Sequence, residues 1–280
     1  MAGSGRRGDR LDVVLVARGL APTRARAQAL ILTGRVWSEG RRMDKPGVRV
    51  AESTPIEVAE GRRWVGRGAG KLDGVLDLWN VDVSGRDALD VGASTGGFTQ
   101  VLLERGARRV IALDVGHGQL DWGLRNDSRV HVIENCNARF LDVRALPWIA
   151  GVAVVDVSFI SLELVLAPVV GALADDGELL ALVKPQFEVG RGKVGRGGIV
   201  RDPARHREVL LGLGGFVRAR DWGLVDVAAS PVPGAEGNRE FFLRIVRGRR
   251  DLGPDELARR VDRVLVRVGG ANGHAGAIRE

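Results

Sequence analysis

The sequence predicts an α/β fold in which a Rossmann-like parallel sheet follows a small N-terminal α+β domain. From Leu72 onward, short apolar strand patterns alternate with helical patterns, which is typical of a parallel sheet covered by helices on both faces. Before Leu72, two helical patterns are followed by short strands. Charge divides the chain at the same place, with 15 Lys/Arg against 7 Asp/Glu in residues 1–71 and 27 against 28 in the remainder. We therefore expect a basic module joined to a near-neutral domain.

The basic module is predicted to cover residues 10–60, after a disordered start at residues 1–9. Apolar residues recur at helical spacing from Leu11, and Thr23 is suited to cap a second helix. The excess charge indicates a polyanion-binding surface, and the alternative is a basic face that serves only solubility. Arginine suits phosphate because its planar guanidinium can donate two hydrogen bonds at once. The arginines of this module that we expect to bind RNA are Arg10, Arg24, Arg26, Arg35, Arg41 and Arg42.

The rest of the chain is predicted to form a linker, a main domain and a tail. The glycine-rich residues 61–70 are the expected linker, and the main domain is expected at residues 71–250. Residues 251–280 are predicted to form a C-terminal helix that starts after Pro254, followed by a flexible tail. Seven apolar runs predict the strands of the sheet, at residues 87–91, 110–114, 130–134, 152–156, 179–183, 224–229 and 240–246.

A glycine-rich loop, "DVGASTGGF", joins the first of these strands to a helix. Glycines let a backbone approach a ligand closely, and this place in a Rossmann-like sheet is where nucleotide-like cofactors bind. A dinucleotide is one interpretation, but the pattern D-x-G-x-x-x-G-G is similar to the methyltransferase form and favours S-adenosylmethionine. The residues of this loop that we expect to hold the cofactor are Asp90, Gly92, Ala93, Ser94, Thr95, Gly96, Gly97 and Phe98, with core packing as the alternative for Phe98.

Two further positions are expected beside the cofactor. Asp114 ends the next strand, where its carboxylate can accept hydrogen bonds from both hydroxyls of a ribose. Asn137 and Arg139 follow the third strand and are predicted to approach the adenine edge or the rim of the site. A simple capped turn is the alternative interpretation of these two residues.

Four charged residues lie at the expected ends of strands and helices. Asp156 and Lys184 each end an apolar run, Lys71 precedes the first helix of the domain, and Glu240 begins the last strand. Any one of them alone could be a solvated charge. Because the carboxyl ends of the middle strands face one crevice, we expect Asp156 and Lys184 to meet beside the cofactor. Lys184 is then a candidate base or a stabiliser of a developing oxyanion, since cations nearby lower a lysine pKa and carboxylates raise it.

A basic glycine-rich segment, "EVGRGKVGRGGIVRDP", follows Lys184. We expect Arg191, Lys193 and Arg196 to hold an RNA backbone there, together with Arg67 in the linker and Arg139, and the alternative is a solvated loop. The four histidines show no metal-ligand spacing, so we expect no metal site. The chain has one cysteine, no apolar signal segment and no run long enough to span a membrane, so a cytoplasmic protein without a membrane partner is predicted.

Taken together, these motifs resemble a known family. Residues 10–57 resemble the S4 RNA-binding domain, and the order Lys71, Asp156, Lys184, Glu240 resembles the K-D-K-E tetrad of FtsJ-type ribose 2′-O-methyltransferases. Residues 10–247 closely resemble the TlyA family, also called hemolysin-A-type rRNA methyltransferases. Five motifs carry this resemblance in order, namely "GRGAGKL", "DVGASTGGFT", "ALDVG", "VVDVSFISL" and "LVKPQFEVG".

The resemblance implies an enzyme, with the tetrad as its catalytic residues and S-adenosylmethionine as its cofactor. It implies methyl transfer to cytidine in small-subunit and, in some members, large-subunit ribosomal RNA, and a link to capreomycin susceptibility. The two other hypotheses are a membrane-damaging protein and a non-catalytic ribosome assembly factor. Gly66 and Gly70 depart from the family pattern and are expected to loosen the segment before Lys71. We expect a monomer.

Overall fold

The computed structural model describes residues 8–32, 34–39, 41–51, 53–58, 64–66, 68–190, 194–234, 237–248 and 251–270. It divides the chain into two compact units, Met1–Arg63 and Trp64–Glu280, which are described separately. None of the helices in these described ranges combines the length and apolar character needed to span a bilayer.

The small unit is an α+β domain built on two short helices. Leu11, Leu15 and Ile31 are fully buried between the helices and the strands. The predicted cap is present, since the Thr23 hydroxyl accepts a hydrogen bond from the backbone of Arg26 at 3.2 Å. The elements are β1 (Asp9–Arg10), α1 (Leu11–Ala17), α2 (Arg24–Leu32), β2 (Val36–Ser38), β3 (Arg41–Arg42), β4 (Arg49–Val50) and β5 (Glu57–Val58). β1 pairs with β4, and β2 pairs with β3 and β5, all antiparallel. β1 begins at Asp9, inside the segment predicted to be disordered, and residues 1–7 lie outside the described residues.

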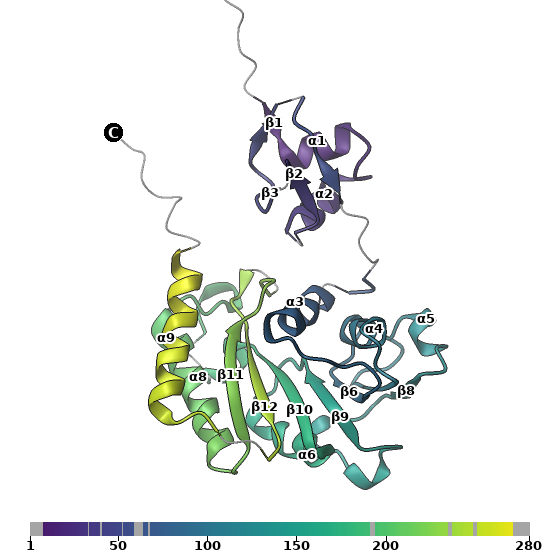
Figure 1. The fold of residues 1–280 in the computed structure, drawn as a ribbon, viewed down its shortest axis with the longest axis vertical. Helices are drawn as coiled ribbons and strands as arrows, with labels where there is room; N and C mark the ends of the chain where they lie inside the picture. The colour runs from purple at the N-terminus through teal and green to yellow at the C-terminus, as the bar shows by residue number, and fades with distance from the viewer. Residues whose placement is uncertain are drawn as a thin grey trace, which may run out of the picture. The chain divides into compact units, whose positions relative to one another are not determined.

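The large unit is a seven-stranded sheet with helices on both faces (Figure 1). The strand order is β11-β12-β10-β9-β6-β7-β8. All seven predicted strands are found, and β10 begins six residues earlier than predicted, at Leu173 instead of Leu179. They are β6 (Asp87–Val91), β7 (Arg109–Leu113), β8 (Val130–Ile133), β9 (Ala150–Val155), β10 (Leu173–Val183), β11 (Gly223–Ala229) and β12 (Phe241–Val246).

The sequence predicts a parallel sheet, but the observed sheet is mixed. β12 lies between β10 and β11 and is antiparallel to both, whereas the other neighbouring pairs are parallel. Val183, the last residue of β10, pairs with Phe241, the first residue of β12. The start of β12 therefore lies at the same edge of the sheet as the ends of β9 and β10.

Two apolar cores lie on the two faces of this sheet. α3 (Ala69–Trp79) and α4 (Gly97–Glu104) cover one face, and α6 (Leu166–Gly171) and α8 (Pro203–Arg218) cover the other. The C-terminal helix α9 (Pro254–Gly270) packs on α8 and on the edge strand β11, beside which it runs in Figure 1. The remaining helices are short, namely α5 (Trp122–Arg125), α7 (Pro185–Glu188) and the 3₁₀ turns η1 (Ala138–Phe140), η2 (Val143–Ala145), η3 (Leu162–Leu164) and η4 (Arg196–Gly198).

The segment before α3 is docked on the large unit. The backbone N–H of Val65 donates to the Gln100 side chain at 2.8 Å, and Trp64 packs against the core under α3 and α4. A Cβ atom on Gly66 would lie 2.5 Å from the Thr95 hydroxyl, so this glycine permits close packing rather than loosening the segment. α3 begins at Ala69, inside the linker predicted at residues 61–70.

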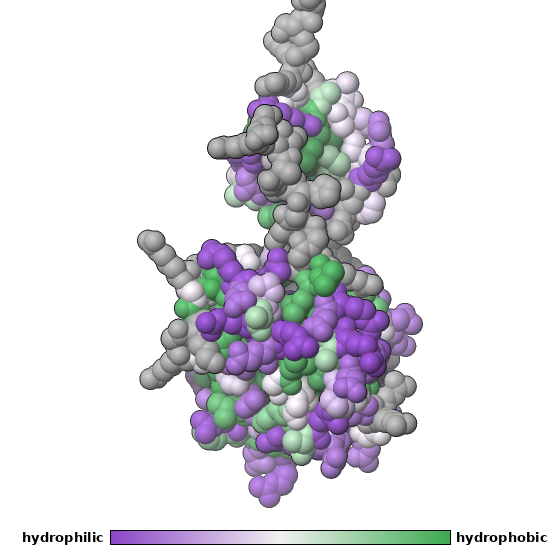
Figure 2. All heavy atoms as spheres, turned by 90° about the vertical axis from the view of Figure 1, so that its left-hand side faces the viewer, coloured by the Kyte–Doolittle hydropathy of each residue, from purple (hydrophilic) through white to green (hydrophobic). Residues whose placement is uncertain are grey.

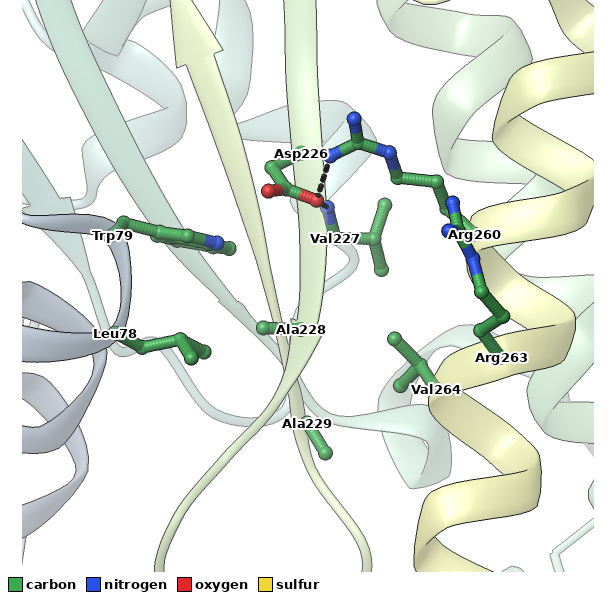
Figure 3. A pocket seen from close by; sticks show the side chains of 9 residues that line it. All are labelled: Leu78, Trp79, Asp226, Val227, Ala228, Ala229, Arg260, Arg263 and Val264. Atoms are coloured by element: carbon green, nitrogen blue, oxygen red, sulfur yellow. Dashed lines mark hydrogen bonds and ion pairs between the residues drawn. The ribbon is translucent and has the colours of Figure 1, made fainter.

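A groove of about 420 Å³ lies at the β11 edge of the sheet (Figure 3). Figure 2 faces this side of the molecule and shows apolar and charged side chains mixed over its surface. Asp226 and Arg260 form an ion pair of 2.6 Å across the groove. Its lining comes from α3, β11 and α9, and consists of Leu78, Trp79, Asp226, Val227, Ala228, Ala229, Arg260, Arg263 and Val264.

Candidate active site

Two short ion pairs gather the four predicted catalytic residues at one edge of the sheet. Lys71 Nζ lies 2.6 Å from Glu240 Oε2, and Lys184 Nζ lies 2.6 Å from Asp156 Oδ1. All four side chains are shielded, with exposed fractions of 10% for Lys71, 3% for Glu240, 11% for Lys184 and 19% for Asp156. Such shielded pairs need good geometry to offset the cost of removing charges from water.

Sheet topology explains why these residues meet. Asp156 and Lys184 follow the parallel neighbours β9 and β10, so both lie just beyond the carboxyl edge. Glu240 reaches the same edge from the opposite direction, because β12 is antiparallel. Lys71 lies in the first turn of α3, not before the helix as the sequence had suggested.

The electrostatics couple the two pairs. Burial raises the pKa of the Glu240 carboxyl above its ordinary value, and the nearby cations Lys71 and Lys184 act against that rise. The negative charge of Asp156 adds to it. Glu240 therefore interacts with all three other members of the tetrad, and the four groups are one electrostatic unit.

Ser158 belongs to this site and was missed in the sequence. Lys184 Nζ donates to its hydroxyl at 2.8 Å, so two acceptors from one short segment hold the lysine. Its position two residues after Asp156, at the end of the same strand, was the signal available. Phe159 follows with its side chain 90% exposed and a φ of +64°, which is rare for a bulky residue and is found mainly at functional sites.

The glycine-rich loop lies against the same strand ends. Gly92 has a φ of +87°, and a Cβ atom there would lie 2.5 Å from the carbonyl oxygen of Asp156. The Asp114 carboxylate accepts from the backbone of Ser94 at 2.8 Å and from the backbone of Gly116 at 2.6 Å. The loop and the tip of β7 thus form a tight backbone cradle with a half-buried carboxylate on its rim.

Several predicted cofactor residues turn inward. Asp90 is fully buried and accepts a hydrogen bond of 2.7 Å from the Thr99 hydroxyl. Burial raises the pKa of Asp90 to about 7, the Thr99 hydrogen bond opposes the rise, and Asp156 and Asp114 add to it. Phe98 is 3% exposed and stacks on Phe242 in the core. Core packing, the alternative interpretation of this residue, is therefore the one observed.

The other loop positions divide between buried and open. Ala93, Gly96 and Gly97 are buried, whereas Ser94 and Thr95 are exposed. Asn137 is exposed, and its side-chain oxygen caps η1 by accepting from the backbone of Arg139 at 3.0 Å. The capped turn expected as the alternative is therefore present.

The arginines of the small unit are organised around a carboxylate. Asp12 is fully buried and accepts hydrogen bonds from Arg10 at 3.0 and 3.1 Å, from Arg24 at 3.0 Å and from Gln28 at 2.7 Å. The Arg10 hydrogen bond holds the pKa of Asp12 well below its usual range, although burial acts in the opposite direction. The side chains of Arg10 and Arg24 keep exposed fractions of 44% and 55%, so their outer faces stay open.

The other predicted RNA-binding residues are more dispersed. Burial lowers the pKa of the half-buried Arg35, and the nearby cation of Arg26 lowers it further, so these two arginines are close. Arg41 is exposed in β3, and Arg139 is exposed, with its guanidinium 5.3 Å from the Phe140 ring centre. Arg67, Arg191 and Lys193 lie outside the described residues, as do the side chains of Arg42 and Arg196.

No group of three or more His, Cys, Asp or Glu side chains suited to a metal ion occurs within the ranges the structure describes. The candidate site brings together the four charged residues, a glycine-rich backbone cradle and an exposed aromatic ring.

The fold and the site define a class of protein. Residues 64–247 match the family of FtsJ-like methyltransferases, and residues 9–56 match the S4 domain. The chain therefore belongs to the FtsJ-like methyltransferase family and is an enzyme of that class with an S4 domain at its N-terminal end. The predicted fold class and enzyme class are confirmed.

Individual relatives narrow this class. The 16S/23S rRNA (cytidine-2′-O)-methyltransferase TlyA of Mycobacterium tuberculosis is 48% identical over 236 residues, which cover 84% of this chain and 88% of that protein. Hemolysin A of Brachyspira hyodysenteriae is 37% identical over 241 residues, covering 85% and 99%. A solved structure named as a hemolysin, from Streptococcus thermophilus, is 35% identical with a TM-score of 0.70 and covers 96% of this chain and 99% of its own. The predicted resemblance to the TlyA family is confirmed.

Proposed function

We propose that this protein transfers a methyl group from S-adenosylmethionine to the ribose 2′-hydroxyl of a cytidine in ribosomal RNA. One observation carries the proposal, namely that Lys71, Asp156, Lys184 and Glu240 form two ion pairs beside a glycine-rich cofactor cradle. A ribose hydroxyl is a weak nucleophile, and a shielded set of positioned charges is the means by which a protein activates such a group.

The cradle fits an adenosyl cofactor. Gly92 lies so close to the Asp156 carbonyl that no Cβ atom fits, so the loop is held against the strand end that carries Asp156. Asp114 lies at the tip of the neighbouring strand, where a carboxylate can accept from ribose hydroxyls. When bound, the cofactor supplies an electrophilic methyl group. The chain's own part is to hold the adenosine at the loop and at Asp114, with the tetrad beside it.

Lys184 is the residue we assign to the acceptor hydroxyl. An ammonium group has three N–H donors, and two of them point to Asp156 and Ser158. The third can donate to the ribose oxygen, where it would stabilise the negative charge that develops as the hydroxyl proton passes to water and the oxygen takes the methyl group from the cofactor's sulfur. Lys71 and Glu240 hold the other side of the site through their own ion pair.

The RNA substrate is inferred from the small unit and from the relatives. Arg10 and Arg24 present half-exposed guanidinium groups over Asp12, and Arg26 and Arg35 form a second cationic group. Such surfaces bind phosphate backbones. The relative in Mycobacterium tuberculosis is named for cytidine in 16S and 23S rRNA. We propose the same class of substrate here, with the reaction taking place on ribosomal subunits in the cytoplasm.

Phe159 is suited to receive the target base. Its ring is 90% exposed and lies three residues after Asp156 in the chain. Enzymes that act on single nucleotides take the base out of its stack and pack it on aromatic side chains. Phe159→Ala is therefore expected to weaken productive RNA binding without changing affinity for the cofactor.

The test is a transfer assay with labelled S-adenosylmethionine and purified small subunits, large subunits and free rRNA. We expect label on the 2′-oxygen of a cytidine, mapped by resistance of the following phosphodiester to alkaline cleavage. Label on a base instead of a ribose would mean that the protein methylates RNA at a different atom, which would overturn the ribose assignment. No transfer to any RNA would overturn the whole proposal.

A further inference from the structure

A carboxylate outside the tetrad connects the segment that carries Asp156 to the segment that carries Lys184. Glu188 ends α7, four residues after Lys184. Its Oε2 accepts from the Ser161 hydroxyl at 2.7 Å, and its Oε1 accepts from the backbone of Leu162 at 2.9 Å. These two donors lie five and six residues after Asp156. Glu188 therefore cross-links the segment after β9 to the segment after β10.

Both ends of this cross-link are rigid. Leu162 is 1% exposed and belongs to the main core, so its N–H is a fixed point. α7 is a single turn in which the Phe187 N–H donates to the Lys184 carbonyl at 2.9 Å, so Glu188 has a fixed relation to Lys184. A second contact reinforces the junction, since the rings of Phe159 and Phe187 lie 4.9 Å apart.

Partial burial of the Glu188 carboxylate costs free energy, which suggests that this residue serves the candidate active site. Burial raises the pKa of Glu188, and the hydrogen bonds from Leu162 and Ser161 oppose the rise. The turn that it holds includes Phe159 at a positive φ, a conformation that persists only when its surroundings impose it. Glu188 is half-buried, and both of its hydrogen bonds go to one strained turn. It therefore helps to fix the position of that turn.

We propose that Glu188 is a positioning residue for methyl transfer, fixing the separation of Asp156 and Lys184 and the orientation of Phe159. This inference rests on the proposed function, since the ion pair must be the one that faces the acceptor hydroxyl. Glu188 is not a member of the tetrad, and its two hydrogen bonds go to Ser161 and Leu162. Its effect passes through the backbone on either side, and catalysis is sensitive to displacements of about 1 Å.

The experiment compares Glu188→Ala, Glu188→Gln and the control Glu163→Ala. In Glu188→Gln the amide oxygen can still accept from Leu162, and the amide nitrogen can donate to the Ser161 oxygen. We expect Glu188→Ala to lower kcat by about 10- to 100-fold, with little change in cofactor Kd. Glu188→Gln should recover most of the wild-type kcat. Glu163 is an exposed carboxylate in the same turn, and its charge adds to the rise in the pKa of Glu188. Glu163→Ala changes the charge near the turn but keeps both hydrogen bonds of Glu188, so we expect a wild-type kcat.

A crystal structure of Glu188→Ala provides a readout that does not depend on turnover. We expect the Lys184–Asp156 ion pair to be lengthened or lost. A kcat equal to that of wild type with the pair intact would overturn the inference, as would a parallel loss of cofactor binding and thermal stability that explains the lost rate. An inactive wild type would overturn the proposed function, and the crystal structure would still decide the positioning role.

Discussion

At the scale of single residues, the protein uses charges in two ways. The tetrad places charges where they can act on a hydroxyl, and Asp12 and Glu188 hold other groups in place. The sequence singled out Asp156, Lys184 and Glu240 because each adjoins an apolar run, whereas Lys71 was predicted from the resemblance to the K-D-K-E tetrad. It could not predict Asp12, Ser158 or Glu188 as partners, because those contacts join segments whose spatial relation depends on the whole fold.

Lys184→Ala is expected to lower kcat by about 100-fold or more while leaving cofactor affinity close to wild type. The physical reason is the loss of the only side chain held by both Asp156 and Ser158 in the described part of the site. Single-turnover transfer and calorimetric titration of the cofactor measure the two quantities. Arg144→Ala, which removes a 92% exposed cation, is the control. Unimpaired transfer by Lys184→Ala would remove Lys184 from the mechanism.

Asp90 makes stability depend on pH. Its folded pKa, about 7, lies above its ordinary value near 4, so the folded state binds more protons between those limits. The stability contributed by this carboxyl is full at acid pH and is lost as pH rises through 7. Asp90→Asn cannot ionise, so we expect it to gain stability over wild type on going from pH 5 to pH 8, by up to a few kcal/mol.

Urea unfolding of both forms without cofactor, at pH 5 and pH 8, measures this difference. Asp175→Asn is a suitable control because the side chain of Asp175 is fully exposed. Parallel pH profiles for wild type and Asp90→Asn would show that Asp90 titrates as an ordinary carboxyl in the folded protein.

At the scale of elements, the fold was predicted well and the direction of one strand was not. Every strand of the large sheet was found, yet β12 runs antiparallel. An apolar run reads the same in either direction, so strand pattern alone does not give orientation. The connection from β11 to β12 did hold a signal, since parallel neighbours need a crossover of a dozen residues or more, usually helical. Residues 230–240 are too few and too rich in proline and glycine for one.

The turn after β6 is expected to tolerate no side chain at Gly92. Gly92→Ala would place a methyl group 2.5 Å from the Asp156 carbonyl and would also occupy a strained φ. We expect cofactor affinity to fall by about tenfold or more, as calorimetry can measure.

Gly85→Ala is the matched control for Gly92→Ala. Gly85 has a φ of +68° with nothing within 4 Å of an added Cβ, so this variant isolates strain from collision. Equal losses of cofactor affinity in the two variants would mean that strain, not the close approach to Asp156, determines binding.

At the scale of the whole molecule, charge is divided unevenly between two compact units. Residues 1–63 hold 13 Lys/Arg against 7 Asp/Glu, and the four residues of the tetrad lie in the large unit. Trp64 and Val65 begin the large unit and pack on its core, so we expect this unit to bind the cofactor without the residues before them. RNA affinity and chemistry should therefore be separable by truncation.

Deleting residues 1–63 is expected to weaken RNA binding and to reduce its dependence on salt, since fewer phosphate contacts release fewer counterions. Cofactor affinity should change little. Filter binding to an rRNA fragment over a range of salt concentrations, with calorimetry of the cofactor, tests both statements. An unchanged salt slope would mean that the small unit makes no phosphate contacts.

The place of β12 in the sheet also has a consequence for how the protein is made. β12 is the last strand to leave the ribosome, and it inserts between β10 and β11, both of which are synthesised earlier. β11 has no partner in the sheet until β12 arrives. The same segment brings Glu240 to Lys71, 169 positions upstream. A nascent chain therefore cannot assemble its tetrad before the ribosome has synthesised the last strand of the large sheet. We expect methyl transfer only from chains in which β12 has been completed.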